Sequence, residues 1–62
     1  MPIVTIDLVE GRTIEQKREL AKRITDAIVE LLKTTPDQVT IIYRDGPRSN
    51  FAKAGALLSD RK

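Results

Sequence analysis

The stretch PIVTIDLVEGRTIEQK, residues 2–17, joins two different hydrophobic patterns. Apolar and β-branched residues fill positions 2–9, which is typical of a β-strand, and Pro2 stands first, where a missing N–H is tolerated. Residues 10–12 form a turn. Thr13 followed by Gln16 then matches a capping box, the pattern that opens an α-helix. This stretch therefore predicts a strand that leads directly into a helix.

Two further segments continue the pattern. Apolar residues recur every three or four positions over residues 14–33, which predicts one long amphipathic helix that Pro36 prevents from continuing. The apolar stripe consists of Leu20, Ala21, Ile24, Ala27, Ile28, Leu31 and Leu32. Residues 39–44, VTIIYR, predict a second strand, which we expect to end at the sequence Asp45-Gly46-Pro47.

Strand, helix and strand in this order form a βαβ unit of the α+β class. The two strands are expected to be parallel, with the helix over one face of the sheet. Residues 50–62 are too short for a second substantial helix and are expected to form a small hairpin or tail that contacts a neighbouring copy. Since no repeat or linker divides the sequence, we expect one domain, residues 1–62.

The short length requires support for the core. A chain of 62 residues buries only about 60% of the surface that its unfolded form exposes. The sequence contains no Cys and no His, which excludes disulfides and the common zinc sites, and we expect neither a metal nor a cofactor. Self-association is the remaining way to stabilise so small a core. The sheet face that the helix leaves uncovered carries Ile residues, so we expect another copy to cover it.

The composition also limits the function. Without His or Cys, a Ser-His-Asp triad, a cysteine nucleophile and histidine acid–base catalysis are excluded. The net charge is only +2 and charges of both signs alternate along the chain, which argues against nucleic-acid binding, although Arg44, Arg48 and Lys53 offer that alternative. No apolar run spans a bilayer and no secretory signal is evident, which predicts a cytoplasmic protein.

Pro2 offers an unusual proton carrier. Removal of Met1 would leave Pro2 with a free secondary amine, and α-amino groups titrate at about 7.7–8.0. An apolar pocket with nearby cations would lower that pKa further, which makes the amine a neutral base at physiological pH. The alternative is that Pro2 only begins an edge strand. If Met1 is retained, the Pro2 nitrogen is a tertiary amide and is not basic.

Several short motifs resemble the 4-oxalocrotonate tautomerase family over nearly the whole chain. They are Pro2, the sequences LVEGRT at 8–13 and EQK at 15–17, and the pairs Asn50-Phe51 and Ala54-Gly55. The resemblance implies a cofactor-independent tautomerase in which Pro2 is the general base that converts a small enol or dienol 2-oxo acid to its keto isomer. It implies that Arg12 binds and polarises the substrate carboxylate, and that Phe51 keeps the pocket apolar. It also implies a homohexamer, a trimer of dimers whose βαβ units pair into four-stranded sheets.

The chain departs from this family at two positions. The family's best-studied members carry a second arginine where this sequence has Thr40, and Arg44 on the same strand face is about 13 Å further along. Lys53 stands where an apolar pocket residue is expected. The sequence therefore leaves two predictions for the substrate. The protein either acts weakly on the family's dicarboxylate substrate or acts on a different 2-oxo or enol acid. Two alternative functions are a dehalogenase-like or hydratase-like enzyme that acts on an unsaturated acid, and a non-catalytic oligomer that binds acids or nucleic acid.

Overall fold

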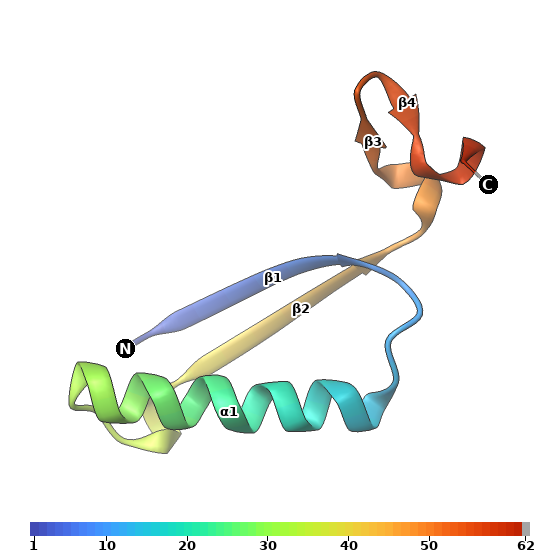
Figure 1. Cartoon of the computed structure of the whole chain (residues 1–62). Helices are drawn as coiled ribbons and strands as arrows, with labels where there is room; N and C mark the ends of the chain where they lie inside the picture. Colours follow the sequence, from blue (N-terminus) through green and yellow to red (C-terminus); the bar gives the residue numbers. More distant parts are fainter. Residues whose placement is uncertain (62) are drawn as a thin grey trace.

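The computed structural model describes residues 1–61 and contains one helix, two long strands and a small hairpin (Figure 1). The main elements are β1 (Ile3–Val9), α1 (Ile14–Leu32), β2 (Thr40–Gly46), β3 (Ala52–Lys53) and β4 (Ala56–Leu57). Short 3-10 turns lie at Pro36–Gln38, Arg48–Asn50 and Leu58–Asp60. Among residues 1–61, no helix is long and apolar enough to cross a membrane.

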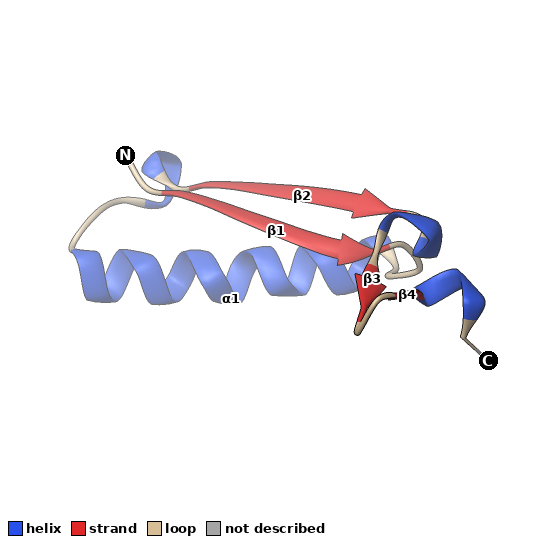
Figure 2. Ribbon diagram, turned by 90° about the horizontal axis from the view of Figure 1, so that it is seen from above, coloured by secondary structure: helices blue, strands red, loops and turns tan. Residues whose placement is uncertain are grey.

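Strands β1 and β2 pair in parallel, from Ile3 opposite Thr40 to Val9 opposite Gly46. Helix α1 runs along one face of this pair (Figure 2), which confirms the predicted βαβ unit of the α+β class. The predicted end of the second strand is wrong, because β2 continues to Gly46. The extension is held by Gly46, whose carbonyl accepts a hydrogen bond of 2.8 Å from the Glu10 N–H.

Both ends of α1 have identifiable causes. The capping box is confirmed, since Thr13 Oγ1 accepts from the Gln16 N–H at 3.1 Å and Gln16 Oε1 accepts from the Thr13 N–H at 2.9 Å. At the other end, Lys33 adopts a left-handed conformation with φ of 56°. That backbone cannot continue a helix, so α1 ends at Leu32, one residue earlier than predicted.

Apolar side chains pack between α1 and the sheet, but a single copy does not bury them fully. The half-buried residues at this interface are Val4, Ile6, Leu8, Ala21, Ile24, Ile28, Ile41 and Tyr43. No residue among 1–61 reaches full burial. On the uncovered sheet face Ile3 is 63% exposed and Ile42 is 42% exposed, and on α1 Leu31 is 74% exposed. The chain thus presents more apolar surface than one helix and two strands cover.

The C-terminal hairpin of β3 and β4 is confirmed and projects away from the βαβ unit (Figure 1). Its two-residue turn consists of Ala54 and Gly55, which both have positive φ, 54° and 82°. Positive φ at both central residues matches the twist of a tight hairpin.

Candidate active site

Pro2 lies at the end of the sheet where both long strands begin. Its carbonyl accepts a hydrogen bond of 3.0 Å from the Thr40 N–H, which holds Pro2 beside the first residue of β2. Pro2 is half-buried, whereas Met1 is 81% exposed. With Met1 attached, the Pro2 nitrogen is a tertiary amide, so this position becomes basic only after Met1 is removed.

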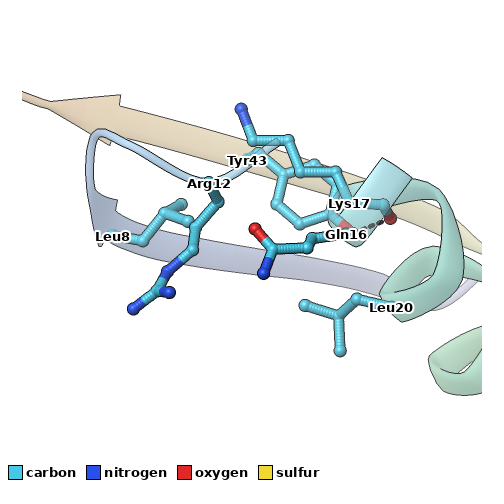
Figure 3. Close-up of a pocket in the computed structure, with 6 residues that line it drawn as sticks. All are labelled: Leu8, Arg12, Gln16, Lys17, Leu20 and Tyr43. Carbon is cyan, nitrogen blue, oxygen red and sulfur yellow. Dashed lines mark hydrogen bonds between the residues drawn. The ribbon is translucent and has the colours of Figure 1, made fainter. Parts of the chain in front are cut away.

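Arg12 lies at the opposite end of the sheet. Gly11 has φ of 122°, a conformation that L side chains rarely adopt, and it turns the chain from β1 toward α1. Arg12 then lines a pocket of about 200 Å³ between β1, the first turns of α1 and β2 (Figure 3). The lining residues are Leu8, Arg12, Gln16, Lys17, Leu20 and Tyr43.

One wall of this pocket is held by contacts between α1 and β2. Lys17 Nζ forms an ion pair of 2.8 Å with Asp45 Oδ1 and lies 5.7 Å from the centre of the Tyr43 ring. The Tyr43 hydroxyl donates a hydrogen bond of 2.8 Å to the Lys17 carbonyl (Figure 3). The ammonium charge of Lys17 is therefore already balanced, and the Tyr43 ring is fixed in place.

The guanidinium of Arg12 has no such partner among residues 1–61. Neither an ion pair nor a hydrogen bond within the described chain engages it. Its planar donors can bind a carboxylate through two parallel hydrogen bonds. An exposed guanidinium above an apolar floor suits a small organic acid.

Phe51 lies near the same end of the sheet as Arg12. Its ring packs so closely on Gly46 that a Cβ there would lie 3.1 Å from Phe51 Cε2. Phe51 is half-buried but does not line the pocket of Arg12 within one copy. The three predicted site residues are thus divided, with Arg12 and Phe51 at one end of the sheet and Pro2 at the other.

The length of β1 sets the distance between Pro2 and Arg12. Strand β1 has seven residues, which at about 3.3 Å per residue separate Pro2 from Arg12 by roughly 20 Å or more. A small acid cannot bridge that distance. A site that uses both residues must take them from two copies of the chain.

The remaining candidate cations are engaged or lie elsewhere. Arg44 Nε forms an ion pair of 2.8 Å with Asp7 Oδ1, its neighbour across the two strands. Arg48 Nη2 donates to the Leu58 carbonyl at 2.7 Å. Lys53 is exposed on β3. Within one copy, Arg44 is thus paired with Asp7 and lies four residues along β2 from Thr40.

The sequence did not predict most of the pocket wall. Lys17 and Tyr43 meet only because α1 packs across β2, which no local pattern specifies. A usable signal exists in the helical period, which places Gln16 and Leu20 four residues apart on one face, beside the turn that carries Arg12.

Comparison with known proteins identifies the family. The sequence profile described as "Tautomerase enzyme" matches residues 2–61. The chain belongs to the tautomerase family. This tautomerase-family chain is 37% identical over 60 residues to 2-hydroxymuconate tautomerase of Bacillus subtilis, with 97% of each chain covered. It also superimposes with a TM-score of 0.91 on a 4-oxalocrotonate tautomerase isozyme from Methylibium petroleiphilum, with 42% identity and coverage of 97% and 94% of the two chains.

Two less similar solved structures illustrate the range of assemblies and activities among the relatives of this chain. A heterohexamer 4-oxalocrotonate tautomerase from Chloroflexus aurantiacus is 26% identical with a TM-score of 0.91, and both chains are covered in full. A structure from work on trans-3-chloroacrylic acid dehalogenase activity is 30% identical with a TM-score of 0.81, and covers 90% of this chain and 97% of that one. The family thus includes a hexamer and a protein studied for dehalogenation.

Proposed function

We propose that this tautomerase-family protein converts a small enol or dienol 2-oxo acid to its keto isomer without a cofactor. The observation that carries the proposal is the guanidinium of Arg12, which has no partner within residues 1–61, beside a small, largely apolar pocket. Such a site suits an organic acid with an enol next to its carboxylate. The similarity to 2-hydroxymuconate tautomerase supports the same reaction class.

In the proposed reaction, Pro2 is the general base. Once Met1 is removed, the neutral secondary amine accepts the enol O–H proton, the oxygen electron pair forms the C=O bond, and the enol double-bond electrons take a proton at carbon from the Pro2 ammonium. Atoms and charges balance, because Pro2 ends as it began. Arg12 binds the carboxylate and stabilises the negative charge that develops on the adjacent oxygen.

The proposed site combines Pro2 from one copy with Arg12 from another. The separation along β1 requires this, and the exposed Ile3, Ile42 and Leu31 provide apolar surface for the contact. We propose a homohexamer, a trimer of dimers, in which Phe51 shields the amine from water. The heterohexamer from Chloroflexus aurantiacus supports this stoichiometry for a relative.

Intact mass combined with an ultraviolet assay tests the proposal. The mature protein is expected to begin at Pro2 and to turn over phenylenolpyruvate or 2-hydroxymuconate. The same chain with an uncleaved N-terminal extension should be inactive, since its Pro2 nitrogen is an amide. Pro2→Ala should lose activity only in part, because a primary amine remains. A correctly processed protein with no turnover above buffer would refute the proposal and leave a non-catalytic oligomer.

A second candidate function is the addition of water to an unsaturated acid with loss of halide. The similarity to the structure associated with trans-3-chloroacrylic acid dehalogenase activity favours testing it. Halide release from 3-chloroacrylate measures this activity directly. We expect the tautomerase substrates to be turned over faster than 3-chloroacrylate.

A further inference from the structure

We propose that the pocket beside Arg12 selects acids that have one carboxylate and an apolar tail, and that Leu20 determines this selectivity. The consequence for catalysis rests on the proposed function, and the preferred substrate is then the enol of an aryl or alkyl 2-oxo monocarboxylic acid. Binding to the pocket is independent of that chemistry and is tested separately.

The charges in the pocket specify one anionic group. Two cationic side chains line it, Arg12 and Lys17. Lys17 is held by Asp45 at 2.8 Å, so its positive charge is already compensated. A carboxylate placed against Lys17 would also meet the negative charge of Asp45. Arg12 is therefore the single lining cation without a partner in residues 1–61.

Apart from the neutral side chain of Gln16, the other lining residues are largely apolar, and the volume is small. Leu8 lies beside the Arg12 side chain, and Leu20 and the ring of Tyr43 line the part of the pocket further from the guanidinium (Figure 3). The pocket measures about 200 Å³, and an apolar cavity of about 150 Å³ holds one benzene molecule. One ring or a short alkyl chain fits beside the carboxylate. A second carboxylate near Leu20 would find no cation to balance its charge, because the other polar group there is the neutral side-chain amide of Gln16.

The Pro2 end of the sheet does not supply the missing cation either. The strand residues beside Pro2 are Ile3 and Thr40, both uncharged. Arg44, further along β2, is paired with Asp7. When Pro2 of a second copy approaches the pocket, the strand ends that it brings are neutral. Neither the pocket lining nor the strand ends beside Pro2 therefore offer an unpaired cation to a second carboxylate.

A binding titration tests the pocket itself. We expect 3-phenylpropionate to shift the amide resonances of residues 8–20 and Tyr43 in the ¹⁵N spectrum of the assembled protein, and to bind at least about tenfold more tightly than adipate, which has two carboxylates. Arg12→Gln should abolish this binding. Equal or tighter binding of adipate, or shifts confined to another region, would overturn the proposal.

A matched pair of variants isolates the role of Leu20. Leu20→Lys and Leu20→Gln have similar size and helix propensity, so the two differ mainly in charge. Leu20→Lys should change the preference toward adipate by about tenfold relative to Leu20→Gln, because it offers the second carboxylate a partner. No difference between the two variants would show that Leu20 does not determine selectivity.

Turnover by the wild-type protein separates the two proposals. A higher kcat/KM for phenylenolpyruvate than for 2-hydroxymuconate supports both. A higher kcat/KM for 2-hydroxymuconate would overturn the monocarboxylate proposal and leave the tautomerase function intact. If neither acid is turned over but 3-phenylpropionate binds as expected, the selectivity of the pocket stands and the catalytic proposal fails.

Discussion

Arg12 differs from four other arginines of the chain in having no partner in the described residues. Arg23 pairs with Glu19, Arg44 with Asp7, and Arg48 and Arg61 donate to the carbonyls of Leu58 and Lys53. An arginine that stabilises the fold is expected to have such a contact. Arg18 also has no ion pair or hydrogen bond within residues 1–61, but it does not line the pocket. The position of the Arg12 guanidinium at the pocket, together with its lack of a partner, therefore favours a ligand-binding role over a structural one.

Removing this guanidinium should reduce catalysis without unfolding the protein. Hydrogen bonds to charged groups contribute about 1.5–3 kcal/mol, so Arg12→Ala should lower kcat/KM by roughly 10- to 100-fold. Arg12→Lys should recover only part of the loss, because a lysine lacks the planar fork. Steady-state kinetics with phenylenolpyruvate measure both. Unchanged kcat/KM in Arg12→Ala would contradict the role assigned to this residue.

At the scale of elements, patterns that depend on neighbouring residues were predicted well. The capping box at Thr13 and the stop before Pro36 each depend on a few adjacent residues, and both are present. A small hairpin was one of the two forms expected for residues 50–62, and its turn lies at Ala54-Gly55. The end of β2 was predicted too early, because its pairing depends on Glu10, far away in the sequence. The pocket was not predicted for the same reason.

The site residues illustrate the same limit. Pro2 was singled out as a proton carrier in a chain without His or Cys, and Arg12 was found through a family resemblance. The structure adds where the two lie relative to each other along β1. Lys17 and Tyr43 were absent from the prediction because their contact crosses from α1 to β2. Contacts between elements follow from tertiary packing, which a single sequence does not display.

The helix cap provides a test at this scale. Thr13→Ala removes the oxygen that accepts from the Gln16 N–H and should lower the free energy of unfolding by about 1 kcal/mol per chain. Thr13→Asn retains a capping oxygen and should cost much less. Urea denaturation of both variants measures this difference in the free energy of unfolding. The protein concentration must be the same in each experiment, because association adds to stability. Equal stability of Thr13→Ala and wild type would contradict the capping role.

At the scale of the whole molecule, the single chain is extended. Its radius of gyration is 14.8 Å, against about 11 Å for a compact chain of 62 residues. None of residues 1–61 is fully buried, and large apolar side chains are exposed on both α1 and the uncovered sheet face. A fold with so little core is marginal by itself, which favours an assembly of several copies.

A charge on the uncovered sheet face should therefore disrupt this assembly. Ile42 lies there, and Ile42→Asp would place an unpaired carboxylate in the proposed contact between copies. We expect dissociation at micromolar concentration in light scattering, together with loss of turnover. Ile42→Val keeps an apolar side chain and should preserve both. An Ile42→Asp protein that remains assembled and active would show that this face is not an interface.

The central claim is that Pro2 and Arg12 act together from different copies, and subunit mixing tests it most directly. One chain carries an N-terminal extension that blocks Pro2, the other carries Arg12→Ala, and the two are dissociated, mixed in equal amounts and reassembled. If each site draws Pro2 and Arg12 from different copies, random mixing should restore roughly a quarter of the wild-type activity. If mixed assemblies form, as native mass spectrometry would show, and activity does not rise above that of the separate variants, the claim is wrong.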